Sequence, residues 1–234
     1  MSERPIHKQT PLRLQQEPYI VPQCDATYEL LLERPEFIIV SKPSGLLTVP
    51  GRHPLNQDSL SNRLSEVYDT PRIVHRLDMD TSGILVVGLT QAAASEFGKL
   101  FQGRAVDKEY VAVVDGLIEA DRGHIDFPLI ADWVNRPLNK VCYATGKKSH
   151  TEFEVLERDE KLNRTRVKLI PHTGRSHQLR IHMREIGHSI IGCDMYASDE
   201  ICYAGDRLML HARYIGFDDP FTGDRIDVSF EASF

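Results

Sequence analysis

The segment His75-Arg76-Leu77-Asp78-Met79-Asp80-Thr81-Ser82-Gly83 leads directly into the apolar run Gly83–Leu89. A short, continuous apolar run next to turn residues predicts a buried strand. The polar segment is therefore expected to form a loop at the edge of a rigid sheet, where catalytic side chains are commonly held. On its own, the segment also fits a simple turn in which Asp78 or Asp80 accepts hydrogen bonds from backbone N–H groups.

Strand patterns outnumber helical patterns along the rest of the chain. β-branched content and alternation predict strands over residues 37–40, 110–114, 151–156, 165–170, 208–217 and 225–230. Helices are expected over residues 58–68, after Thr90 as an N-cap, and from Ser176 as an N-cap to near Gly187. Short connections favour antiparallel pairing, so the predicted class is α+β, with a mixed, mainly antiparallel sheet flanked by helices and loops.

Residues 1–26 are rich in proline, glutamine and charge, which predicts a flexible or surface-draped extension. Residues 27–234 are expected to form a single catalytic domain. The seven-residue apolar run is too short to cross a bilayer, and the polar N-terminus does not resemble a secretion signal. We therefore expect a cytoplasmic protein with no membrane partner. Its four cysteines form no C-x-x-C pair, so reduced thiols are favoured over a single disulfide.

Charge is segregated along the chain, although the net charge is −6. Residues 163–184 contain six basic side chains and no acidic one, and residues 133–151 contain four basic side chains and no acidic one. Nine acidic residues lie between Asp194 and Glu231. This distribution predicts a basic face on an acidic protein, which suits contact with a polyanion. The alternative is two solvated basic stretches with no special role.

A second polar segment, residues 172–182, reads His-Thr-Gly-Arg-Ser-His-Gln-Leu-Arg-Ile-His. A glycine turn entering a helix N-terminus brings backbone N–H groups, the helix dipole and Arg175 together as an anion site. His177, Arg180 and Arg184 are spaced to share one helix face, with apolar residues opposite. The histidine spacing matches neither H-E-x-x-H nor a Cys/His finger, so no metal site is predicted.

Four segments in order resemble the motif set of the RluA family of pseudouridine synthases. They are H-R-L-D-x-x-T-S-G from His75, K-x-Y from Lys108, T-G-R-x-H-Q-L-R-x-H from Thr173, and R-L-x-L-H-A from Arg207. The resemblance covers about residues 37–234. The stretches 131–137 and 140–143 narrow it to the branch that acts on 23S ribosomal RNA and on the anticodon stem-loop of certain tRNAs. That branch lacks the S4-type RNA-binding domain of many relatives, and none is expected here.

This resemblance implies the pseudouridine synthase catalytic fold and isomerisation of uridine within structured RNA. It implies that Asp78 is the catalytic aspartate, that Tyr110 and Arg175 are its active-site partners, and that Arg76 enters the space left by a flipped nucleotide. The reaction needs no redox change, so no cofactor and no nucleotide partner are expected. Further RNA contacts are expected from His75, Lys108, Arg136, His177 and Arg180. A carboxylate in a partly closed pocket needs a nearby cation to remain ionised, and Arg175 is the candidate.

Two other classes of function remain open from the sequence. One is an RNA-binding module without catalysis, which the presence of Asp78, Tyr110 and Arg175 disfavours. The other is a metal-dependent hydrolase that uses the histidine-rich segment. A protein kinase is excluded, because Leu77 separates Arg76 from Asp78 and neither a glycine-rich loop nor Asp-Phe-Gly is present. The sequence does not fix the oligomeric state, and a monomer is the working expectation.

Overall fold

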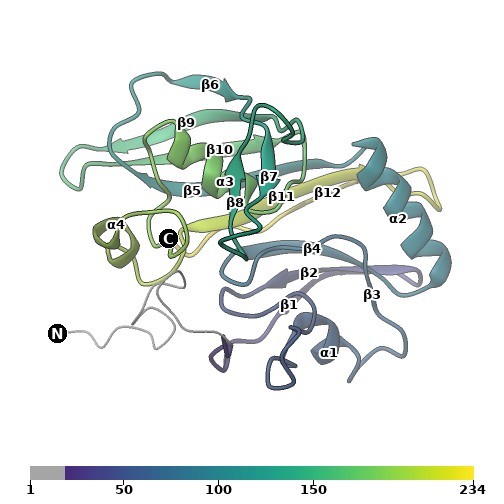
Figure 1. The fold of residues 1–234 in the computed structure, drawn as a ribbon. Coiled ribbons are helices and arrows are strands. Elements are labelled where there is room, and N and C mark those ends of the chain that lie inside the picture. The colour runs from purple at the N-terminus through teal and green to yellow at the C-terminus, as the bar shows by residue number, and fades with distance from the viewer. Residues whose placement is uncertain (1–18) are drawn as a thin grey trace. The chain divides into compact units, whose positions relative to one another are not determined.

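The computed structural model describes residues 19–234, which form two compact units (Figure 1). We call residues 19–108 with 211–234 the Asp78 unit, and residues 109–210 the Arg175 unit. The expectation of one domain over residues 27–234 stays a prediction. Residues 1–18 of the expected N-terminal extension lie outside the described residues, whereas residues 19–26 belong to the Asp78 unit.

The Asp78 unit is built on a sheet with the strand order β1-β2-β4-β11-β12. β4 and β11 pair in parallel, and the other neighbours in this series are antiparallel. β3 also pairs with β4. The strands are β1 (Glu29–Glu33), β2 (Phe37–Lys42), β3 (Arg72–Ile73), β4 (Ser82–Gly88), β11 (Leu210–Asp218) and β12 (Arg225–Ser229). β2 and β4 are buried along their whole length, as their apolar composition predicts.

Helix α2 (Gln91–Gly103) covers this sheet through Ala93 and Phe97. The Thr90 side chain accepts a hydrogen bond from the Ala93 N–H at 3.0 Å, so the predicted N-cap is confirmed. Phe97 packs edge-on against Phe37 and Phe217, with ring centroids 5.0 and 5.2 Å away. The rings join α2, β2 and β11 in one apolar core.

The helix expected over residues 58–68 is shorter than predicted. α1 spans Leu60–Leu64, with Ser59 as its N-cap, and Val67 lies beyond its end and is exposed. Arg63 binds the Asp58 carboxylate at 2.7 Å and donates to the carbonyl oxygens of Ala26 and Cys24. These contacts hold residues 24–26 against the helix.

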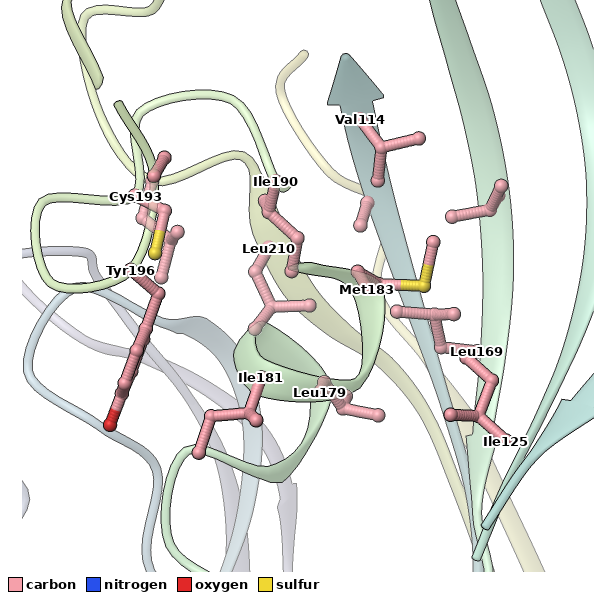
Figure 2. Close-up of a cluster of buried hydrophobic side chains, with 14 of the residues drawn as sticks. Val114, Ile125, Leu169, Leu179, Ile181, Met183, Ile190, Cys193, Tyr196 and Leu210 are labelled. Carbon is pink, nitrogen blue, oxygen red and sulfur yellow. The ribbon is translucent and has the colours of Figure 1, made fainter. Parts of the chain in front are cut away.

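The Arg175 unit contains an antiparallel sheet with the order β5-β10-β9-β6 and a separate hairpin of β7 and β8. The strands are β5 (Asp107–Asp115), β6 (Arg122–Ile125), β7 (Leu129–Ala131), β8 (Asn139–Val141), β9 (Thr151–Asp159) and β10 (Arg164–Pro171). Two helices, α3 (Gln178–Glu185) and α4 (Asp199–Tyr203), complete it. Figure 2 shows Leu179 and Met183 of α3 pointing into an apolar cluster that includes Leu169 of β10.

Helix α3 differs from the amphipathic helix expected after Ser176. Its N-cap is His177, in the left-handed conformation with φ +57°, and all residues from Gln178 to Met183 are buried. Polar Arg180 and His182 therefore lie in the interior together with the apolar residues. Spacing alone could not reveal this, because it does not report what packs on the polar side of a helix.

The predicted fold class is confirmed in both units, since most of the strand pairs are antiparallel and helices lie beside them. All four cysteines are free thiols. None of the helices formed by residues 19–234 has the length and apolar content that a membrane span requires.

Candidate functional site

Asp78 lies in the loop between β3 and β4, four residues before the buried strand β4 begins at Ser82. Its side chain is half-buried, whereas Leu77 before it is buried in the core. The Asp78 carbonyl oxygen accepts the Thr81 N–H at 3.2 Å, which closes a turn over Met79 and Asp80. The loop therefore combines a local turn with an accessible carboxylate.

Residues 42–48 hold the backbone on both sides of Asp78. Thr48 Oγ1 donates to the Leu77 carbonyl at 2.7 Å and accepts the Leu77 N–H at 3.3 Å. On the other side, the Gly45 N–H and Lys42 Nζ both donate to the Met79 carbonyl, at 3.0 and 2.9 Å. Ser44 Oγ adds a bond to the Asp80 carbonyl at 2.7 Å. The position of Asp78 is thus fixed by its neighbours' backbone.

The end of the loop is anchored where β4 meets β11. Gly83 has φ +114°, and a Cβ at this position would lie 2.2 Å from the Ala212 carbonyl oxygen. Ser82 Oγ lies 2.7 Å from His211 Nδ1, and His211 Nε2 lies 2.8 Å from the Phe230 carbonyl. Because a carbonyl only accepts, His211 donates from Nε2. The motifs T-S-G and L-H-A are therefore joined at one strand pair.

His75 is half-buried at the start of this loop. Its Nε2 accepts the Val86 N–H at 2.9 Å, and its ring lies 4.3 Å from the Phe101 ring, centroid to centroid. Burial, with the nearby positive charge of Lys108, lowers the pKa of His75 to about 3. Burial also lowers the pKa of Lys108. The imidazole is half-buried and its Nε2 is occupied by a backbone N–H, so we assign His75 a structural role in place of the expected RNA contact. Arg76 is exposed.

Arg175 is positioned by the side chain of Gln178, the first residue of α3. Gln178 Oε1 accepts the Arg175 N–H at 3.0 Å and the Thr173 hydroxyl at 2.7 Å. Its Nε2 donates to the His150 carbonyl at 3.0 Å and to Thr151 Oγ1 at 2.9 Å. This buried amide therefore ties the Arg175 loop to the start of β9. The Arg175 side chain is half-buried, and its Nε donates to the Lys148 carbonyl at 3.2 Å.

Tyr110 lies on β5, directly opposite Leu169 of β10. Its half-buried ring packs against the apolar cluster of the Arg175 unit. The rigid sheet therefore fixes the backbone from which the Tyr110 side chain extends.

Arg180 was expected to contact RNA, but its side chain is buried in an ion pair. Its guanidinium lies 2.5 Å from Asp194, and the exposed fractions of the two side chains are 1% and 9%. Arg180 Nε also lies 3.3 Å from the Cys193 sulfur. A guanidinium held in this way is not available to a phosphate, so we assign Arg180 a structural role. His177 Nδ1 lies 2.5 Å from the Tyr196 hydroxyl.

The predicted basic face over residues 163–184 is also reduced by pairing inside the protein. Lys168 lies 2.6 Å from Glu154, and Arg184 pairs with its neighbour Glu185. Arg164 donates to the Ala204 carbonyl at 2.9 Å. Glu185 directly follows the segment, whereas Glu154 comes from the neighbouring strand β9, and the sequence alone does not show that it pairs with Lys168.

An exposed aromatic and basic surface lies on the loop between β7 and β8. Trp133 and Val134 are 69% and 89% exposed, and the Arg136 guanidinium lies 3.5 Å from the Trp133 ring centroid. Lys140 is held by Asp132 at 3.2 Å. We call Trp133 and Arg136 the Trp133–Arg136 stack. A flat indole with a guanidinium on one face resembles the platforms on which unpaired bases stack.

The expected site residues fall in both units. The Asp78 unit holds His75, Arg76, Asp78 and Lys108, and the Arg175 unit holds Tyr110, Arg136, Arg175, His177 and Arg180. The sequence reasoning missed Lys42, Thr48 and Gln178, which hold the loops of Asp78 and Arg175. The role of Lys42 had a signal in the sequence, because a lysine there closes the apolar run of strand β2, which is fully buried.

Comparisons with known proteins support the predicted family. Residues 36–185 match the family model described as RNA pseudouridylate synthase. The chain is 48% identical over 88% of its length to the dual-specificity RNA pseudouridine synthase RluA of Yersinia pestis, covering 99% of that protein. It is 45% identical over 94% of its length to the enzyme of the same name from Escherichia coli K12, covering 96% of it.

Solved structures agree with this assignment. Human RNA pseudouridylate synthase domain containing 1 superposes with a TM-score of 0.77 at 28% identity, covering 91% of this chain and 86% of that one. The predicted resemblance is confirmed over most of the sequence. The chain therefore belongs to the RNA pseudouridylate synthase family, and the two bacterial relatives compared above are RluA enzymes of that family.

Proposed function

We propose that this enzyme isomerises specific uridines in structured RNA, with Asp78 as its catalytic carboxylate and with Tyr110 and Arg175 as catalytic partners. The observation that carries the proposal is the loop around Asp78. Its backbone is held at Leu77, Met79 and Asp80 by residues 42–48, while the carboxylate itself is half-buried. Such pre-organisation of one acidic group is what catalysis by proximity requires.

The reaction breaks the N1–C1′ bond of uridine and joins C5 to C1′. An ionised Asp78 serves either as a nucleophile at C1′ or as a base that takes a proton from C2′. Both routes need the carboxylate in its charged form, and a guanidinium favours that form. We assign this role to Arg175. Neither route includes a redox step or a group donor, so the proposal contains no cofactor.

The target base must leave its stack before its sugar can approach Asp78, at a cost of roughly a few kcal/mol. Arg76 is exposed and two residues from Asp78, which suits a guanidinium that fills the vacated space. Uridines in loops are the cheaper targets because they are less firmly paired. Tyr110 is proposed to stack on the uracil.

The proposed substrates are 23S ribosomal RNA and the anticodon stem-loop of tRNA. The support is the dual specificity in the names of the relatives, which this chain matches over most of its length. Ribosomal and transfer RNA place the proposed site of action in the cytoplasm. Lys108, Arg136 and His177 are kept as proposed RNA contacts. His75 and Arg180 are not, because both are engaged inside the protein.

The decisive experiment is Asp78→Asn, assayed for pseudouridine formation in 23S rRNA fragments and tRNA anticodon stem-loops. We expect pseudouridine formation to be abolished while folding and RNA binding are retained, because the amide keeps the shape of the side chain but not its charge. Asp69→Asn changes an exposed carboxylate of the same unit and serves as the matched control.

Full activity in the Asp78→Asn enzyme would refute the catalytic assignment. If the unmodified protein binds these RNAs but forms no pseudouridine in either, the non-catalytic RNA-binding module is favoured instead. Pseudouridine formation in only one of the two RNA classes would support the proposed reaction and contradict the proposed dual specificity.

A further inference from the structure

The outer strands of the Arg175 unit gather histidines and carboxylates that the proposed reaction does not use. His124 of β6 pairs directly with Glu152 of β9. His150 precedes β9, and its carbonyl accepts the His172 N–H at 3.1 Å, which continues the pairing of β9 with β10. Residues that are directly opposite, or two apart on a strand, point to the same face. His124, His150, Glu152 and His172 therefore share one face of the strands β6, β9 and β10. Figure 1 shows these three strands side by side.

Three of these side chains converge. Ligand atoms of His150, Glu152 and His172 all lie within 4.8 Å of one another. Glu152 Oε1 lies 3.0 Å from His172 Nε2 and 3.7 Å from His150 Nε2. Two imidazole nitrogens and one carboxylate form the His₂Glu ligand set that zinc accepts, and the same set suits other divalent transition metals.

The remaining nitrogen of His150 is already oriented for this purpose. Its Nδ1 lies 2.5 Å from Asp126 Oδ1, so the ring donates to a carboxylate on one side and turns Nε2 toward Glu152 on the other. A ring N–H bound to a carboxylate is the usual outer support of a metal-ligating histidine, because it fixes the tautomer and the ring orientation.

The surroundings leave room for an ion. His150 and Glu152, together with His124 and Asp126, line a hollow of about 630 Å³. His172 is not part of this lining and reaches the cluster through Glu152, at 3.0 Å. The side chains of His150, Glu152 and His172 are 35%, 50% and 45% exposed, so all three side chains are accessible to solvent. A bound ion would keep positions for water in addition to its protein ligands.

We propose that His150, Glu152 and His172 bind one divalent transition metal ion of the zinc type, with Asp126 supporting His150 from behind. The site joins the start of β9 to the end of β10, where the Arg175 loop leaves the sheet. His150 is also bonded through its backbone to Gln178 and Thr173, which position that loop. Metal binding therefore stabilises the Arg175 unit at the base of the loop.

The test is calorimetric titration of the untagged full chain with zinc, together with visible absorption after titration with cobalt. We expect saturable binding of one ion per chain, cobalt bands in the visible range, and a melting temperature that rises with zinc concentration. His172→Gln and Glu152→Gln should remove the binding. Asp126→Asn should weaken it about 10- to 100-fold, as loss of an outer-shell partner does.

His53→Gln, a histidine change in the Asp78 unit, is the control and should leave the affinity unchanged. The proposal is overturned if zinc shows no saturable binding, or if it binds His172→Gln and Asp126→Asn as tightly as the unmodified chain. Circular dichroism of each variant separates loss of a ligand from loss of the fold. None of these readouts depends on the RNA reaction.

Discussion

Lys42 Nζ lies 2.9 Å from the carbonyl oxygen of Met79, the residue that follows Asp78. The same ammonium donates to the carbonyls of Pro43 and Leu46 at 2.8 and 2.7 Å, and the side chain is fully buried. A buried charge is tolerated when it is fully hydrogen-bonded, and here its partners are backbone groups of two loops. Lys42 therefore acts on Asp78 through the backbone.

We expect Lys42→Met to destabilise the protein and to lower pseudouridine formation. The carbonyls of Pro43 and Leu46 lose the lysine donor at a cost of about 1–3 kcal/mol each, whereas the Met79 carbonyl keeps the Gly45 N–H. The loss in unfolding free energy should therefore reach roughly 2 kcal/mol or more. Urea denaturation and single-turnover rates would measure the two effects. Lys99→Met is the control, because Lys99 is 69% exposed and pairs with Glu96 on the surface, so it should change stability by less than about 0.5 kcal/mol. Equal effects of the two changes would contradict the role of Lys42.

The sequence predicted the Asp78 loop because its signals are local: turn residues followed by an apolar strand. The bond between Lys42 and Met79 spans 37 residues, and no pattern along the chain specifies which carbonyl a lysine will reach. The expected RNA contact by Arg180 was wrong for the same reason. Its spacing on α3 indicated an exposed cation, but its burial depends on Asp194, which lies beyond the end of the helix. The sequence therefore predicts local geometry such as the Asp78 loop. The partners of buried polar groups can be identified only from the folded structure, because they lie far away along the chain.

Gln178→Glu tests whether the Arg175 loop is positioned by this side chain. The carboxylate keeps the acceptor for the Arg175 N–H but loses the donor to the His150 carbonyl, which then faces a negative charge. We expect a fall in kcat with little change in RNA affinity, and non-additivity with Arg175→Ala in a double-mutant cycle. Rate losses that simply add would mean that Gln178 acts independently of Arg175. Gln57→Glu, at an exposed position, is the control.

The Trp133–Arg136 stack should contribute to RNA affinity. Stacking of a base on an aromatic side chain is worth about 1–3 kcal/mol, so Trp133→Ala should weaken binding by that amount. Arg136→Ala should also reduce the dependence of log Kd on log salt by about one charge if it contacts a phosphate. Fluorescence anisotropy with a labelled stem-loop at several salt concentrations measures both. Val134→Ala, at a neighbouring exposed side chain, should have no effect. If all three variants bind the stem-loop as tightly as the unmodified protein does, the loop does not contact RNA.

The stability of the protein should fall with pH below neutrality because of His75. Its pKa is about 3 in the folded chain and about 6.5 when unfolded, so the unfolded state binds a proton that the folded state refuses. The contribution is complete above about pH 6.5 and is lost as the pH falls toward 3, at up to about 1.4 kcal/mol per pH unit. His75→Asn should remove this part of the slope in urea denaturation between pH 7 and 5. His182, whose pKa is also lowered by burial, should sustain a residual slope. Identical slopes in both proteins would contradict this account.

Gly83→Ala should strongly destabilise the Asp78 unit. The new Cβ would lie 2.2, 2.6 and 2.8 Å from backbone atoms of Ala212, and the φ of +114° is unfavourable for any L side chain. Because backbone cannot move aside as a flexible side chain does, we expect β4 and β11 to separate, at a cost of about 3 kcal/mol or more. Gly98→Ala is the matched control, since no atom lies within 4 Å of its added Cβ in α2. That change should raise stability by about 0.5–1 kcal/mol, because alanine restricts the unfolded chain and favours the helix. If Gly83→Ala were tolerated as well as Gly98→Ala in thermal and urea unfolding, the close contact at this strand pair would not be what fixes the end of the Asp78 loop.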